Sequence, residues 1–241
     1  MNRVHHICVS LSSVFVFICA ISISAQWNKP YAEMSEKEAR KLLNDSPWGH
    51  TRVYSYTSGA YSPGKYRSGQ RTSGTDSSAE SLHYLNIRVR FLSAKPIRQA
   101  FSRMMMLGQN GQAPYQLAAQ LKAFTTQDFS NDIVVSVDCD ATEAKNELWE
   151  FKMLLSTRSM ADLKSNTYLS AKGQRAYIES FLMPKNDGLG AKFIFPRTVD
   201  GKPAIPADSD EIQFYADISS KYKLNIHFKT KDMLVDGKLE Y

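Results

Sequence analysis

Alternation of apolar and polar residues is the feature that most limits what this chain can fold into. Residues 85–91, 212–218 and 222–228 each place apolar side chains at every second position. A period of two is typical of a β-strand with one dry and one solvated face. The turn sequence at 185–188, Lys-Asn-Asp-Gly, predicts a hairpin between two of the other candidate strands. Those other candidates are 52–56, 133–137, 167–171, 176–183 and 191–195.

Helical patterns occur mainly in the first half of the chain. Ser35 and Glu38 form the sequence signature of a capping box, which predicts a helix that ends before Pro47. Three more helices are indicated by apolar residues at helical spacing, over 97–108, 114–124 and 144–155. Ser93 is expected to be the N-cap of the helix over 97–108. Helices followed by antiparallel strands predict an α+β fold, with an antiparallel sheet packed against two or three helices.

The first 25 residues have the pattern of a secretory signal peptide. A short region containing Arg3 precedes an apolar run from Ile7 to Ile21, and small residues follow at 22–25. Cleavage is expected after Ser24 or Ala25. The alternative is a retained membrane anchor over 7–25, which is long enough to span a bilayer. The cleaved chain would be periplasmic or extracellular, with no stable membrane span.

Export changes the charge and the cysteine count of the chain. Removing residues 1–25 lowers the formal net charge from +6 to +5 and leaves one of the three cysteines, Cys139. No internal disulfide is then possible, which excludes a disulfide-stapled scaffold. Cys139 follows an apolar run, so we expect a buried thiol, with pairing to another molecule as the alternative.

Domain organisation follows from a change in composition at residues 57–80. This stretch is rich in serine, threonine and glycine and has little apolar surface, so it predicts a flexible linker. It would separate an N-terminal helical segment, 26–56, from an α+β domain, 81–241.

One motif resembles a catalytic site. The apolar strand that ends in Asp138-Cys139-Asp140-Ala141-Thr142 resembles the nucleophile motif of haloacid-dehalogenase-like phosphatases. The resemblance implies that Asp138 attacks a phosphoryl group, that Asp140 is the acid/base and that Mg²⁺ is the cofactor. The alternative is structural: Asp140 caps the following helix with Glu143, and Asp138 is solvated. No spacing typical of a zinc site occurs, so outside the phosphatase alternative we expect neither metal nor cofactor.

Basic side chains suggest a binding surface. Arg88 and Arg90 lie on one face of their predicted strand, and Lys223, His227 and Lys229 on one face of another. If the two strands are neighbours, the sheet has a basic face that suits an anionic envelope polymer, lipid headgroups or nucleic acid. The alternative is that these residues only solvate the sheet.

Three segments resemble parts of a group of uncharacterised, predicted-secreted bacterial proteins. They are Leu-Leu-Asn-Asp-Ser-Pro-Trp at 42–48, Gly-Leu-Gly-Ala-Lys-Phe-Ile-Phe-Pro-Arg at 188–197, and Asp-Gly-Lys-Leu-Glu-Tyr at 236–241. The resemblance implies export and carries no catalytic residue. We therefore expect a non-catalytic cell-envelope or extracellular binding protein whose partner is an envelope polymer or another envelope protein. The phosphatase is the alternative.

Overall fold

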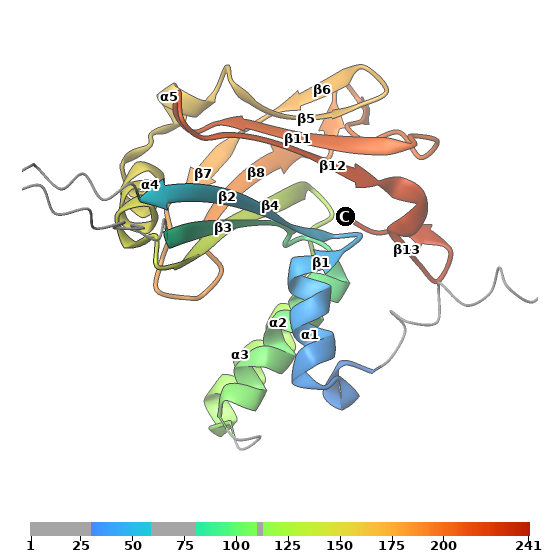
Figure 1. Ribbon diagram of the computed structural model, residues 1–241. Helices are drawn as coiled ribbons and strands as arrows, with labels where there is room; N and C mark the ends of the chain where they lie inside the picture. Colours follow the sequence, from blue (N-terminus) through green and yellow to red (C-terminus); the bar gives the residue numbers. More distant parts are fainter. Residues whose placement is uncertain (1–29, 59–80, 110–112) are drawn as a thin grey trace, which may run out of the picture.

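The computed structural model describes residues 30–58, 81–109 and 113–241 (Figure 1). The predicted signal peptide and most of the predicted linker lie outside these residues. The described chain begins with a short 3-10 turn, η2 (Tyr31–Glu33), and a second one, η3 (Thr230–Asp232), lies near the C-terminus. Its helices are α1 (Glu36–Asn44), α2 (Lys95–Gly108), α3 (Tyr115–Thr126), α4 (Lys145–Thr157) and α5 (Met160–Leu163).

The larger of two main sheets has six strands, and all neighbouring pairs are antiparallel. In spatial order these strands are β1 (Asp45–Ser46), β2 (Gly49–Ser58), β3 (Ser81–Phe91), β4 (Asp132–Thr142), β8 (Ala191–Pro196) and β7 (Ser180–Leu182). The hairpin predicted from residues 185–188 is confirmed, because β7 and β8 pair on either side of it and Gly188 adopts the positive φ that such turns require.

The smaller main sheet has four antiparallel strands. Their order is β12 (Lys223–Lys229), β11 (Glu211–Asp217), β5 (Thr167–Ala171) and β6 (Gln174–Tyr177). Two small ribbons complete the strands of the described chain, β9 (Thr198–Val199) with β10 (Lys202–Pro203) and β13 (Leu234–Val235) with β14 (Lys238–Leu239).

The core lies between the two main sheets, which are stacked in Figure 1. Phe91 of β3 meets Phe228 of β12 edge to face, with ring centroids 4.7 Å apart. Phe214 of β11 meets Phe193 of β8 in the same way, at 5.6 Å. These rings are fully buried. The alternating apolar residues of β3, β4, β8, β11 and β12 therefore face one another, and their alternating polar residues face outward.

The helices lie outside this sandwich. Three of them, α1, α2 and α3, extend from the far side of the six-stranded sheet, and α4 lies at one end of the strands (Figure 1). The predicted capping box at α1 is confirmed, since Glu38 N–H donates to Ser35 Oγ at 3.3 Å and Ser35 N–H donates to Glu38 Oε2 at 2.7 Å. Among the described residues no helix is long and apolar enough to cross a membrane.

The mixture of helices and antiparallel strands confirms the α+β class, but the layers differ from the prediction. We expected one sheet packed against helices, whereas the chain forms two sheets packed against each other. The physical reason lies in β11 and β12, whose apolar faces bury against β3 and β8 instead of against a helix. The period of two predicts which residues of a strand are buried. It does not predict whether a helix or another sheet covers them.

The N-terminal segment is part of the same domain. β2 pairs with β3 along ten residue pairs, and the fully buried Trp48 donates its indole N–H to the carbonyl oxygen of Glu240 at 2.8 Å. The structure therefore corrects the expected separation of residues 26–56 from a domain that begins at residue 81.

Two local predictions are also corrected. The single strand expected over 176–183 is two strands, because the chain crosses from the small sheet to the large one at Ile178 and Glu179, whose amides bond to different sheets. Ser93 does not cap α2. Its hydroxyl accepts from Val134 N–H at 3.1 Å and so ties the start of the helix to β4, while Ala94 takes the cap position.

Candidate functional site

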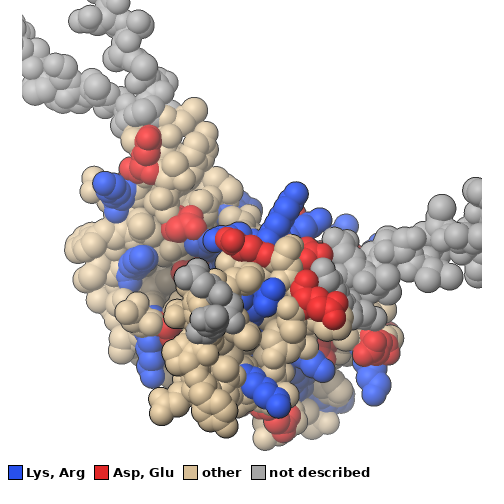
Figure 2. Space-filling model, turned by 90° about the horizontal axis from the view of Figure 1, so that it is seen from below, with Lys and Arg blue, Asp and Glu red and all other residues tan. Residues whose placement is uncertain are grey.

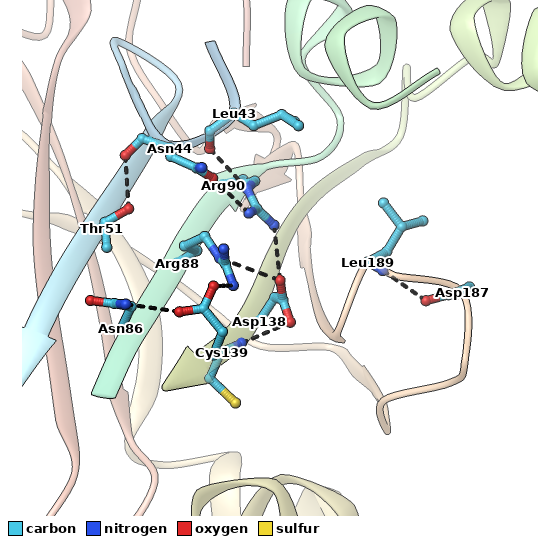
Figure 3. Close-up of polar contacts among 11 residues, drawn as sticks. Leu43, Asn44, Thr51, Asn86, Arg88, Arg90, Asp138, Cys139, Asp187 and Leu189 are labelled. Carbon is cyan, nitrogen blue, oxygen red and sulfur yellow. Dashed lines mark hydrogen bonds and ion pairs between the residues drawn. The ribbon is translucent and has the colours of Figure 1, made fainter. Parts of the chain in front are cut away.

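The first group of predicted site residues lies on the outer face of the six-stranded sheet. Register places Arg88 of β3 directly opposite Asp138 of β4, and Asn86 opposite Asp140. Because directly opposite residues share a face, the period of two brings these side chains together with Arg90. We call Asn86, Arg88, Arg90, Asp138 and Asp140 the charged cluster; it is drawn in Figure 3.

Within the charged cluster every carboxylate has a cation or amide partner. Arg88 contacts both acids, with Nε 3.4 Å from Asp138 Oδ2 and an Nη hydrogen-bonded to Asp140. Asn86 donates to the other oxygen of Asp140 at 2.8 Å. The backbone N–H of Cys139 donates to Asp138 Oδ1 at 2.7 Å, and Arg90 Nη1 lies 3.7 Å from Asp138 Oδ2. The network therefore neutralises the charges of Arg88 and Arg90, which were predicted to be available for binding a ligand.

Arg90 connects this network to the end of α1. Its Nε donates to the carbonyl oxygen of Leu43 at 2.8 Å, and an Nη donates to Asn44 Oδ1 at 2.9 Å (Figure 3). Carbonyls in the last turn of a helix lack partners within the helix, and the guanidinium supplies one for Leu43. Burial lowers the pKa of Arg90 to about 10, although Asp138 opposes the shift. Arg90 is therefore a structural clamp between helix and sheet.

The loop between β7 and β8 closes over the neighbouring part of the same face. Lys192 Nζ donates to Asp187 Oδ2 at 2.7 Å, and Leu189 N–H donates to Asp187 Oδ1 at 2.9 Å. Gly190, at φ +75°, is packed so tightly against β4 that a Cβ atom would lie 2.2 Å from the carbonyl oxygen of Val137. Seen from below, the molecule is hollowed beside the helices, with charged side chains of both signs nearby (Figure 2).

This geometry does not favour the phosphatase hypothesis. Asp138 and Asp140 lie within β4, a strand antiparallel to both of its neighbours, and their oxygens bond to Arg88, Asn86 and the Cys139 amide. A nucleophile and acid/base pair that binds Mg²⁺ needs carboxylate oxygens free to meet a cation. In the described ranges no group of three or more His, Cys, Asp or Glu side chains is arranged to hold a metal ion.

The structural alternative for Asp140 is also corrected. The strand continues through Thr142, and α4 begins only at Lys145 with Ala144 as its N-cap and no side-chain cap. Asp140 therefore caps no helix, and Asp138 is not a solvated strand end but is 28% exposed between two arginines. The sequence placed the strand end five residues too early because aspartate, at 138 and 140, is depleted in strands. Pairing with β3 overrides that preference.

Cys139 points to the opposite face of β4 from the two acids. Its side chain is 6% exposed, and burial raises the pKa of the thiol to about 12. The expected buried thiol is confirmed. A thiol held protonated is a poor nucleophile, which is consistent with a packing role.

The predicted single basic face does not exist. Arg88 and Arg90 belong to β3 of the large sheet, whereas Lys223, His227 and Lys229 belong to β12 of the small sheet, on the outer side of a different layer. The two strands face each other across the core through their apolar residues. Their basic residues consequently point in opposite directions.

The second group of predicted residues lies among charges of the opposite sign. On the outer face of the small sheet, Lys223 Nζ is 3.5 Å from Asp217 Oδ2, and His227 Nδ1 is 2.6 Å from Glu211 Oε1. Lys229 stands directly opposite Glu211 in the register. The face is therefore mixed in charge instead of basic.

Three tyrosines that were not predicted as site residues extend across this face, from the central strands β11 and β5 to the edge strand β6. Tyr168 of β5 stacks on Tyr215 of β11, with ring centroids 5.1 Å apart and planes at 20°. Tyr177 of β6 meets Tyr168 edge to face at 5.8 Å, and the Arg175 guanidinium lies 4.5 Å from the Tyr168 centroid. Beside them Gln213 Nε2 donates to Asn225 Oδ1 at 2.8 Å.

We name the outward side chains of the small sheet the tyrosine face. Its members are Tyr168, Ser170, Arg175, Tyr177, Glu211, Gln213, Tyr215, Asp217, Lys223, Asn225, His227 and Lys229. A signal for it was present in the sequence, since the polar positions of three strands include tyrosines. Only the pairing of β5 with both β6 and β11 shows that these tyrosines are adjacent.

Comparison of the chain with protein-family models, with curated proteins and with solved structures gave no match.

Proposed function

We propose that this chain is an exported bacterial protein that binds a cell-envelope or extracellular ligand without catalysing a reaction, and that the tyrosine face is its binding surface. The observation that carries the proposal is the set of three neighbouring tyrosines and an arginine on the outer face of the small sheet. The export pattern at residues 1–25 supports the location.

The physical chemistry of these residues favours binding. Tyrosine offers a large contact area with few rotatable bonds, so little conformational entropy is lost when a ligand is bound. Mutual stacking holds the rings of Tyr168 and Tyr215 in place before any ligand arrives. Tyrosine and arginine are also the residues that most often dominate the energy of binding surfaces. In the charged cluster, by contrast, both carboxylates already have partners within the protein.

Co-sedimentation with isolated bacterial cell envelopes tests the proposal. The purified wild-type chain is expected to sediment with the envelopes. A Tyr168→Ala, Tyr215→Ala double variant should bind at least about 10-fold more weakly, since each anchor residue contributes roughly 1–2 kcal/mol. Tyr115→Ala is the matched control, because Tyr115 is a tyrosine on α3 that is 88% exposed. It should bind like the wild type.

Two results would overturn the proposal. If the double variant remains folded by circular dichroism and binds as the wild type does, the tyrosine face is not the binding surface. If the purified chain hydrolyses phosphomonoesters with Mg²⁺, and Asp138→Asn abolishes this turnover, the protein is an enzyme and the phosphatase alternative is restored.

A further inference from the structure

We propose that the ligand of the tyrosine face is an uncharged polysaccharide chain. This inference rests on the proposed function and adds the chemical class of the ligand.

The charges of the face argue against a polyanion. Lys223 is paired with Asp217 and His227 with Glu211, while Lys229 stands opposite Glu211. The Arg175 guanidinium lies over the ring of Tyr168. Surfaces that bind single-stranded nucleic acid combine stacking rings with cations that are free to follow the backbone, and their affinity comes largely from those cations. Here the cations beside the rings already have acidic or aromatic partners.

The size and composition of the face argue against a protein partner. The strands lie about 4.8 Å apart, and at about 3.3 Å per residue the seven residues of β11 and of β12, the five of β5 and the four of β6 cover roughly 360 Å². A standard protein interface buries about 800 Å² on each side. No outward position of the four strands carries an aliphatic side chain, so the face also lacks the apolar centre of a stable protein contact.

The remaining groups match the chemistry of a sugar chain. A pyranose ring has C–H bonds that pack on aromatic rings and hydroxyls that both donate and accept hydrogen bonds. The tyrosines provide the rings, and the amides of Gln213 and Asn225 provide donors and acceptors side by side. An open sheet face suits a long chain that lies across the strands, whereas a small molecule is usually enclosed by its site.

Retention on insoluble chitin, cellulose and mannan tests this inference with uncharged polymers. The wild-type chain should be retained on at least one of them, equally at about 0.05 M and about 1 M NaCl, since screening weakens only charge-driven binding. Tyr215→Ala and Asn225→Ala should each reduce retention at least about 5-fold, through the loss of roughly 1 kcal/mol each. Tyr115→Ala and the charge reversal Lys122→Glu change exposed residues of α3, away from the tyrosine face, and should leave retention unchanged.

Other outcomes overturn the inference and separate it from the proposed function. Retention on none of the three polymers contradicts it, as does salt-sensitive binding to single-stranded poly(dT) that Lys223→Glu weakens. If envelopes still bind through Tyr168 and Tyr215, but protease treatment of the envelopes abolishes that binding, then the ligand is a protein. In that case the proposed function stands and the polysaccharide does not.

Discussion

Asp138 and Cys139 are adjacent in β4, yet the pleat of the strand gives them opposite environments. Asp138 faces Arg88 and Arg90 on the outer side of the sheet, and Cys139 faces the interior on the other side (Figure 3). Residues that are consecutive in the motif therefore lie on two different faces of the sheet. The contacts of the two acids with β3 give them a structural role.

Burial of Cys139 predicts low thiol reactivity and a loss of stability at alkaline pH. With a pKa of about 12 against 9.0 when exposed, the folded chain keeps a proton that the unfolded chain releases. The free energy of unfolding should therefore be unaffected below pH 9 and fall between pH 9 and about 12, by up to about 1.4 kcal/mol per pH unit. Urea unfolding measured across this range gives the slope.

Cys139→Ala is the control for this measurement, and its curve should be flatter over the same interval. Iodoacetamide should alkylate the native thiol at about pH 8.5 at least about 100-fold more slowly than it alkylates the chain in urea. Equal alkylation rates in the folded and unfolded chain would show that Cys139 is accessible and would contradict the assignment.

Among the elements, the hairpin of β7 and β8 shows which features the local sequence predicts and which features depend on neighbouring strands. The turn residues at 185–188 identified the hairpin, because Asp-Gly favours the tight turn between antiparallel strands. The close approach of Gly190 to β4 was not foreseeable, since it depends on which strand lies beside β8. The break between β6 and β7 has the same origin.

Two glycine substitutions, one in this hairpin and one in the turn between β5 and β6, separate backbone strain from steric contact. Gly190 and Gly173 have nearly the same φ, +75° and +80°, but a Cβ atom at Gly173 would meet nothing within 4 Å. Gly173→Ala should cost about 1 kcal/mol of stability through strain alone. Gly190→Ala should cost more than about 3 kcal/mol, because Val137 and the loop cannot both stay in place. Chemical denaturation of both variants measures the difference, and equal costs would refute the close packing.

At the scale of the whole molecule, the pairing of β2 with β3 joins the N-terminal segment to the rest of the domain. Composition had predicted that a linker separates the two. Residues 36–58 contribute a helix packed against α2, two strands of the large sheet and the buried Trp48. Composition predicted a boundary at 57–80 because low apolar content marks a segment without a core. It does not show whether the segments on either side are packed together.

Cleavage of the chain between β2 and β3 tests this unity. A specific protease site inserted after Gly69 and cut in the purified protein should yield two fragments that elute together in gel filtration. The ten paired positions of β2 and β3 and the hydrogen bond from Trp48 to Glu240 should hold them. Fragments that separate without denaturant would show that the N-terminal segment folds apart from the rest.

The sequence by itself determined most of the longer helices and strands, their buried faces and the α+β class, because periodicity, capping residues and turn residues act over a few positions. The capping box of α1, the strand at 167–171 and the α4 helix are of this kind. Only the tertiary structure decided that there are two sheets, that Arg88 and Arg90 are neutralised by Asp138 and Asp140, and that three tyrosines meet on one outer face. These are consequences of strand order and register, which bring together residues as far apart as 168 and 215 in the chain. Many strand orders satisfy the same alternation, so no local pattern selects among them.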